Sequence, residues 1–271
     1  MRPDVLPADQ ALGLRQAFGR PGLTVLPVCA PGRDASSQAW IVNLAAALAE
    51  RGRRTVILDA GPGLVSPALG LKARRELRHL LAGECTFDET VLEAGGGLAV
   101  LPAPRGLEMF LASGEAPATL FGAFLALPEP PAILLANGPV ELVAPLVEAG
   151  EEIVFVASPA RESVTGVYAA IKRLEQSFPG RVSRIALTGV ADADSGDALA
   201  RRLADATSRF LGHNPEFAPA VPDDVALHEA ARAGRTVLAA RPDGPAAEAF
   251  RRLADGFDGW RAARHDTPLE G

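Results

Sequence analysis

The chain has 271 residues, of which 48% are hydrophobic and 22% are charged, with a formal net charge of −6. This length can bury a full core as one large α/β domain or two small ones, while the acidic balance offers no chain-wide electrostatic basis for a nucleic-acid partner, and we expect none. The two cysteines, Cys29 and Cys85, lie far apart and give neither a disulfide framework nor a metal-ligand spacing, so no metal site is predicted.

Three parts follow one another along the chain. We expect an amino-terminal arm at residues 1–21, an α/β domain at residues 22–242, and a carboxy-terminal amphipathic helix with a tail at residues 243–271. The arm lacks the long apolar core of a signal peptide, and no run in the chain approaches the about 18 apolar residues of a spanning helix. The sequence therefore predicts a cytoplasmic protein.

Short runs rich in Val, Leu and Ile alternate with longer segments of helical period. This alternation is typical of a doubly wound, mostly parallel sheet with helices on both faces. The clearest helices are expected at 37–51 and 163–178. The expected strands are 23–29, 54–60, 98–103, 132–137, 152–158, 184–190 and 236–240. Because ligands of such sheets bind beyond the carboxyl ends of the strands, the loops that follow the strands are the candidate sites.

The loop "APGRDASSQ" (30–38) stands where nucleotide-binding α/β proteins hold phosphate. Such a loop needs closely spaced glycines, a lysine and a metal-binding hydroxyl. This one has a single glycine, Gly32, no lysine, and a carboxylate at Asp34. Ser36 or Ser37 suits the N-cap of the following helix, whereas Arg33 beside a helix N-terminus leaves weak anion binding open.

Longer stretches of the chain resemble a known family. The run "NLAAALAERGRRTVILDAGPGL" (43–64) closely resembles the MinD/ParA deviant-Walker ATPases, and "SPARESVTGVYAAIKRLE" (158–175) is similar to the segment that follows their fifth strand. The arm's "DQALGLR" (9–15) is similar to the DQAxxLR element of the FlhG (FleN) branch, the regulators of flagellar number and placement. The resemblance covers roughly residues 9–258 and implies a P-loop NTPase-like fold.

The family's working residues are largely absent. Aligned on "NLAAALA", the signature lysine falls on Gly32, the second lysine on Ser37 and the Mg²⁺-binding hydroxyl on Gln38. The first aspartate after the second strand survives as Asp59, while the second, which positions the attacking water in the family, is Gly61.

Two further positions differ as well. The family's switch aspartate falls at Ala136 or Asn137, and its adenine-side "NR" falls at Thr188 and Gly189. Since phosphoryl transfer depends on positioning and on stabilising phosphate charge, we predict a pseudo-ATPase with no catalytic residue and negligible hydrolysis.

What remains of the nucleotide site is a weak remnant. Its residues are Gly32, Arg33, Ser36, Ser37, Gln38 and Asp59. We expect no cofactor, with ATP and Mg²⁺ as the ligands if the altered loop still binds. Asp59, at a strand end, is expected to cap the next segment or pair with Arg33, and residual Mg²⁺ binding is the alternative. Dimerisation stays open, because family dimers form around sandwiched ATP.

The arm carries the predicted partner site. Its residues are Asp9, Gln10, Leu14, Arg15 and Phe18, which combine an apolar helical face with polar neighbours. In FlhG-like proteins this element engages and stimulates the SRP-type GTPase FlhF, so the resemblance implies an FlhF-like GTPase and flagellar assembly proteins as partners. The alternative is a helix docked on its own domain.

The carboxy-terminal segment places an aromatic stripe at helical spacing. Phe250, Leu253, Phe257 and Trp260 form the stripe, and arginines lie on other faces. Basic residues around an aromatic stripe suit a membrane interface, and members of the family use carboxy-terminal amphipathic helices for that purpose. The commoner meaning of such a stripe is a helix packed on the sheet. Peripheral location at the inner face of the cell membrane or at the cell pole is therefore a second expectation.

Together these features predict an FlhG-like regulator of flagellar number and assembly that acts by protein binding. Two alternatives stay open at this point: an active MinD/ParA-like ATPase with an unusual P-loop, and a MinD-like accessory protein of a cellulose-synthesis apparatus.

Overall fold

The computed structural model describes residues 22–31 and 35–262. Within this part of the chain, nine strands form one sheet in the order β3-β4-β2-β5-β1-β6-β7-β8, with β9 also paired to β7. Their bounds are β1 Thr24–Cys29, β2 Thr55–Asp59, β3 Leu92–Gly95, β4 Leu98–Pro102, β5 Ile133–Asn137, β6 Glu152–Ala157, β7 Val182–Val190, β8 Glu216–Phe217 and β9 Val221–Pro222. Every pairing is parallel except that of β3 with β4.

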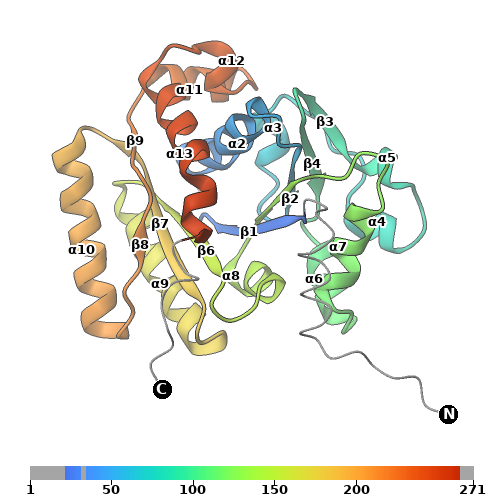
Figure 1. Ribbon diagram of the computed structural model, residues 1–271, viewed down its shortest axis with the longest axis horizontal. Coiled ribbons are helices and arrows are strands. Elements are labelled where there is room, and N and C mark those ends of the chain that lie inside the picture. The colour runs from blue at the N-terminus through green and yellow to red at the C-terminus, as the bar shows by residue number, and fades with distance from the viewer. Residues whose placement is uncertain (1–21, 32–34, 263–271) are drawn as a thin grey trace.

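Helices cover both faces of this sheet (Figure 1). Their bounds are α2 Ala35–Glu50, α3 Val65–Ala68, α4 Leu77–Leu81, α5 Phe87–Thr90, α6 Gly106–Ala112, α7 Pro117–Leu125, α8 Val140–Val143 with the 3-10 turn η1 Ala144–Leu146, α9 Arg161–Ser177, α10 Ala193–Leu211, α11 Val225–Arg232, α12 Val237–Ala240 and α13 Pro245–Ala262. Alternate residues of each strand serve opposite faces. Leu26 and Val28 join the cluster under α2 and α13, whereas Cys29 joins the cluster under α9 and α10. The expected doubly wound α/β fold is confirmed.

The strands expected between residues 23 and 190 are all present, with boundaries within two residues of those expected, and both predicted helices form. The strand expected at 236–240 is wrong, because these residues form α12. The Thr236 side chain caps this helix by accepting from Ala239 N at 3.2 Å, and Asn43 Oδ1 accepts from Val237 N at 2.7 Å. An apolar run this short is compatible with a strand or with one turn of helix, and these two hydrogen bonds stabilise the helix.

The carboxy-terminal helix α13 packs on α2. Phe250 and Leu253 are 0% exposed and Phe257 is 1% exposed, all within the same cluster as Trp40 and Leu44. The prediction that Phe250, Leu253 and Phe257 contact a membrane is therefore wrong, since their apolar surface is already buried against the domain. The side chain of Trp260 lies outside the part of the chain that is described.

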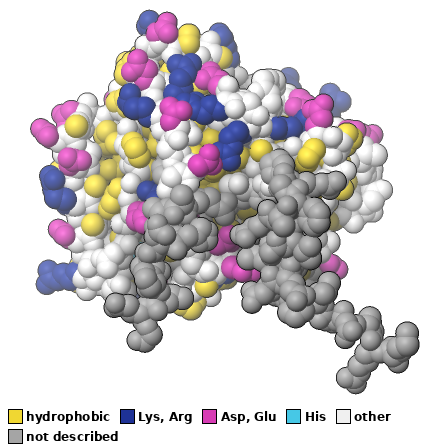
Figure 2. All heavy atoms as spheres, in the orientation of Figure 1, with side chains coloured by type: hydrophobic (Ala, Val, Ile, Leu, Met, Phe, Trp, Pro, Cys, Tyr) yellow, Lys and Arg dark blue, Asp and Glu magenta, His cyan; other side chains and the backbone are white. Residues whose placement is uncertain are grey.

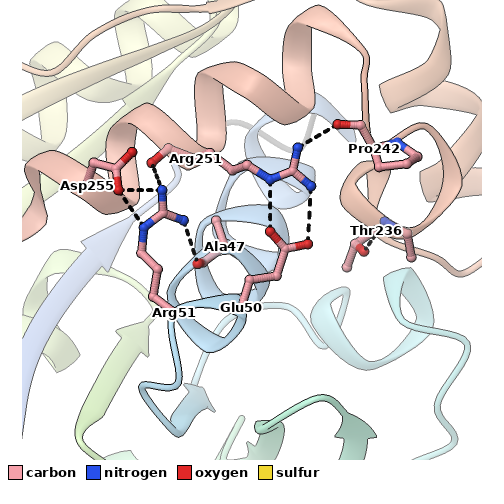
Figure 3. Close-up of polar contacts among 8 residues, drawn as sticks. Ala47, Glu50, Arg51, Thr236, Pro242, Arg251 and Asp255 are labelled. Carbon is pink, nitrogen blue, oxygen red and sulfur yellow. Dashed lines mark hydrogen bonds and ion pairs between the residues drawn. The ribbon is translucent and has the colours of Figure 1, made fainter.

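Ion pairs join the carboxyl end of α2 to the middle of α13 (Figure 3). Arg51 pairs with Asp255 at 2.5 Å and donates to the Arg251 carbonyl at 2.7 Å, and Arg251 pairs with Glu50 at 3.0 Å. Figure 2 shows basic and acidic side chains mixed over the face that carries α13. The helix that buries Phe250, Leu253 and Phe257 thus also pairs its charged side chains with those at the end of α2.

Candidate functional site

A cavity of about 520 Å³ lies beyond the carboxyl ends of three neighbouring strands. Its lining includes Cys29 to Pro31 after β1, Ala60 to Pro62 after β2, and Asn137 to Pro139 after β5. Later strands of the chain pair on the other side of β1, so the cavity stands where the strand order reverses. This is the place where sheets of this type bind ligands.

Asp59 ends β2, directly before Ala60 and Gly61, which line this cavity. Its side chain is 1% exposed, and Asn137 Nδ2 donates to Asp59 Oδ1 at 2.8 Å. The Gly61 N–H donates to the same oxygen at 3.2 Å. Burial raises the pKa of Asp59 above its usual 3.8, against the hydrogen bonds from Asn137 and Gly61, which lower it. The carboxylate therefore braces two adjacent strand ends.

The register of the sheet explains why Asn137 meets Asp59. β2 and β5 are paired with Asp59 beside Asn137, while the preceding Ala136 lies in the apolar cluster under α6 and α7. Of the two positions that the sequence left open for the switch residue, Asn137 is the one that reaches the strand-end site. An amide occupies it.

Gly61 is confined by this pair. A Cβ atom at position 61 would lie 2.8 Å from Asn137 Nδ2 and 3.1 Å from Asp59 Oδ1. A side chain there must push the amide or the carboxylate aside. The Asp59–Asn137 pair therefore leaves no room for the second aspartate that the family carries at this position.

Two other remnant residues, Ser37 and Gln38, lie within the described part of α2. Ser37 is buried in α2. Gln38 is 4% exposed, and its Oε1 has no hydrogen-bond partner among the described residues. Gln38 lines a different cavity, of about 440 Å³, between α2, α3 and α11. Gly32, Arg33 and the side chain of Ser36 lie outside the described part of the chain.

The arm residues also lie outside the described residues. Asp9, Gln10, Leu14, Arg15 and Phe18 all precede residue 22. Their role as a partner site stays a prediction.

Two side chains that the sequence did not single out line the cavity near Asp59. Arg173 reaches it from α9 and is, among the described lining residues, the only cation. It is paired with Glu141 at 2.6 Å. Glu108 from α6 adds a further negative charge to the lining. No local sequence pattern predicts that Arg173 lines this cavity, because only the packing of α9 on the sheet brings it there.

Cys29 also lines the cavity but is poorly reactive. The thiol is 2% exposed, and burial raises its pKa to about 12, with the nearby Glu141 charge acting in the same direction. Because the thiolate is the nucleophile, a thiol with so high a pKa is inert at neutral pH.

A serine, a histidine and a glutamate lie in line elsewhere in the fold. Ser183 Oγ is 2.5 Å from His213 Nε2, and His213 Nδ1 is 2.5 Å from Glu175 Oε1. The order matches a nucleophile, a base and an orienting carboxylate. Ser183, however, is 0% exposed at the start of β7, so no substrate reaches its oxygen. The three residues tie α9, β7 and the loop after α10 together.

The strand ends offer little to a metal ion. Within the described residues, no group of three or more His, Cys, Asp and Glu side chains could hold a metal. Mg²⁺ prefers several oxygen ligands, and the one carboxylate at the end of β2 already accepts from an amide.

Comparison with known proteins agrees with this fold. No family model matches the chain. It is 32% identical over 225 residues to the antiactivator FleN of Pseudomonas aeruginosa, covering 81% of this chain and 80% of the relative. It is 30% identical over 224 residues to the chromosome-partitioning ATPase Soj of Thermus thermophilus, covering 79% and 87%.

Solved structures with the same fold include two of distinct activity. The MinC:MinD cell division complex of Aquifex aeolicus matches with a TM-score of 0.65 at 16% identity, over 92% of this chain and 99% of that chain. Cobyrinic acid a,c-diamide synthase of Mycobacterium smegmatis, with bound ATP analogue and magnesium, matches with a TM-score of 0.63 at 19% identity, over 89% and 97%. With the fold shared this widely and the FleN relative matched over most of both chains, this chain belongs to the FleN (FlhG) branch of the MinD/ParA family.

Proposed function

We propose that this protein is an FlhG-like regulator of flagellar number and assembly that acts by binding other proteins and hydrolyses negligible ATP. The observation that carries the proposal is the Asp59–Asn137 pair, which replaces a catalytic carboxylate with an amide and crowds Gly61. The FleN relative is named an antiactivator, a regulatory function, which supports the same reading.

The charges around the cavity support the loss of hydrolysis. Catalysis of phosphoryl transfer requires cations and a metal to stabilise phosphate charge. The chain has two lysines, Lys72 and Lys172, and neither lies in the loop after β1. Arg173 is paired with Glu141. The donor set in the described residues therefore does not fit a magnesium–triphosphate, although relatives of this fold bind ADP or ATP with magnesium.

Binding to partners falls to the arm in this proposal. Leu14 and Phe18 supply apolar contacts, and Asp9, Gln10 and Arg15 supply polar ones to an FlhF-like GTPase, which the arm stimulates. In this proposal a cytoplasmic protein of this kind reaches the membrane or the cell pole through its partners, because Phe250, Leu253 and Phe257 of α13 are buried.

None of the helices in residues 22–31 and 35–262 is long and apolar enough to cross a bilayer.

Calorimetry tests the nucleotide claim. ATP with Mg²⁺ is titrated into the full chain, and no binding heat is expected in the micromolar range. A micromolar affinity would overturn the pseudo-ATPase assignment. A relative with an intact P-loop lysine serves as the positive control for the titration.

Stimulation of the GTPase tests the partner claim. Asp9→Ala, Gln10→Ala and Arg15→Ala are combined in the full chain and assayed with a purified FlhF-type GTPase. We expect stimulation to be lost, whereas Arg201→Ala with Asp205→Ala, exposed on α10, leaves it intact. Unchanged stimulation by the arm variant counts against the partner role of the arm.

A further inference from the structure

A groove of about 300 Å³ lies beside the point where the amino-terminal arm joins the domain. We name it the α5 groove. It is lined by Arg54, Phe87, Asp88, Val91, Glu93, Leu127, Pro128 and Glu129.

Hydrogen bonds place the start of β1 next to this groove. Thr24 N donates to Ala132 O at 2.9 Å, and Ala132 N donates to Arg54 O at 2.9 Å. Leu23 packs on the same apolar cluster as Phe87 and Leu127. The start of β1 is therefore linked through Ala132 to Arg54, which lines the groove, and the arm joins the domain close to the groove.

The α5 groove combines an apolar floor with an acidic rim. Phe87, held edge-on against Phe124 with ring centroids 5.5 Å apart, forms the floor with Val91 and Leu127. The rim carries three carboxylates, Asp88, Glu93 and Glu129, and one guanidinium, Arg54.

The rim keeps excess negative charge. Arg54 pairs with both Glu93 and Glu129, yet these two side chains stay 59% and 81% exposed. Asp88 is exposed as well. The formal balance of three carboxylates against one guanidinium leaves the rim able to accept further cations.

The arm residues nearest the groove have the complementary chemistry. Residues 12–21, "LGLRQAFGRP", contain two arginines and no acidic residue. Leu12, Leu14 and Phe18 supply apolar side chains that could cover the apolar floor of the groove. Phe18 is four residues before Gly22, and an extended chain of that length spans about 14 Å, so its ring can reach the groove.

We propose that residues 12–20 of this chain fold back onto the α5 groove. Phe18 covers Phe87 and Leu127, and Arg15 and Arg20 face the carboxylates of the rim. The occupied groove is thus an intramolecular docking site for the arm.

Docking has a regulatory consequence that rests on the proposed function. Leu14, Arg15 and Phe18 are the residues assigned to the GTPase, so a docked arm and a partner-bound arm exclude each other. The groove then sets how much arm is available to the partner.

Limited trypsin digestion of the full chain tests the docking without any partner. The measured quantity is the rate of cleavage after Arg15, followed by mass spectrometry, because Pro21 protects the bond after Arg20 from trypsin. Asp88→Asn with Glu129→Gln removes two negative charges from the rim, and we expect cleavage in the arm to accelerate several-fold. Asp197→Asn with Asp205→Asn, which makes the same charge change at exposed positions of α10, leaves the rate unchanged.

Hydrogen exchange gives the reciprocal measurement. Phe18→Asp in the full chain is expected to raise amide exchange in residues 86–93 and 126–132 while exchange in α10 stays as in the parent. Equal exchange in parent and variant, together with equal cleavage rates, overturns the docking. Arm protection that grows with protein concentration overturns it in favour of the arm of a second copy.

The two proposals can fail separately. Neither digestion nor exchange contains a GTPase, so a negative result there speaks only to the groove. If both proposals hold, Asp88→Asn with Glu129→Gln also increases GTPase stimulation at subsaturating concentrations of the protein.

Discussion

Asn137 donates an amide hydrogen to the buried carboxylate of Asp59 at 2.8 Å, across the paired ends of β5 and β2. Each side chain satisfies the other, and together they occupy the space above Gly61. The strand-end site is therefore arranged around a neutral amide and a single carboxylate. This pair holds two strand ends together.

Gly61→Ala tests the crowding directly. The new methyl group would meet Asn137 Nδ2 at 2.8 Å, so we expect the free energy of unfolding to fall by about 1–3 kcal/mol. Gly122→Ala is the matched control, because a Cβ there meets nothing within 4 Å and alanine in α7 stabilises a helix by about 1 kcal/mol. Urea denaturation measures both. In an Asn137→Ala background the penalty at position 61 should shrink, and a penalty that persists unchanged would contradict the proposed clash.

The buried carboxylate predicts a pH dependence of stability. Burial raises the pKa of Asp59, so the folded state holds its proton more tightly than the unfolded chain does. The resulting contribution to the free energy of unfolding is fully present below the unfolded pKa of 3.8 and is lost as the pH rises through the folded pKa.

Asp59→Asn removes this titration. The free energy of unfolding of the parent, relative to that of the variant, should decline as the pH is raised from about 4 to neutrality. Denaturation curves of both proteins across this range provide the measurement, with exposed Asp197→Asn as the control. A relative stability that increases with pH would show that the folded pKa is lowered instead.

Phe250→Ala tests the burial of α13 against α2. Removal of a fully buried ring should lower the free energy of unfolding by about 3–5 kcal/mol, whereas Arg252→Ala, on a side chain 62% exposed, should change it by less than about 0.5 kcal/mol. Sedimentation with anionic vesicles supplies a second measurement, in which the parent should stay in the supernatant. Pelleting of the parent that Phe250→Ala abolishes would restore the membrane-contact hypothesis.

Thiol labelling tests the environment of Cys29. Burial raises the pKa of this thiol to about 12, so an alkylating reagent at mildly alkaline pH should modify the half-buried Cys85 and spare Cys29 in the folded protein. After unfolding, both cysteines should react. Mass spectrometry counts the labels, and rapid double labelling of the native chain would contradict the buried position.

The layered fold was predictable from the sequence because its buried strands are continuous apolar runs. Every residue of "TVILD" at β2 and of "EIVFVA" at β6 is buried, and the polar residues stand only at the ends of these strands, as expected of strands covered by helices on both sides. "TVLAA" is also a short apolar run, but these residues form α12, and the Thr236 side chain caps that helix. Composition alone does not separate these cases.

The sequence predicted only those features of the site that depend on the identity of a single residue. The loss of lysine from the loop after β1 is visible in the sequence, and so is the survival of Asp59. The contact between Asp59 and Asn137 depends on strand register, and the arrival of Arg173 depends on how α9 packs. The alignment of Ser183, His213 and Glu175 arises from three separate elements and has no local signature.

The packing of α13 on α2 also constrains how the molecule is made. More than 190 residues separate Asn43 of α2 from Val237, and α13 follows later still, so the part of α2 that α13 covers stays uncovered on the ribosome until α13 has been synthesised. A premature stop codon before Pro245 would remove α13 from the apolar cluster that contains Trp40 and Leu44. We expect chaperones to bind such a truncated chain and proteases to degrade it.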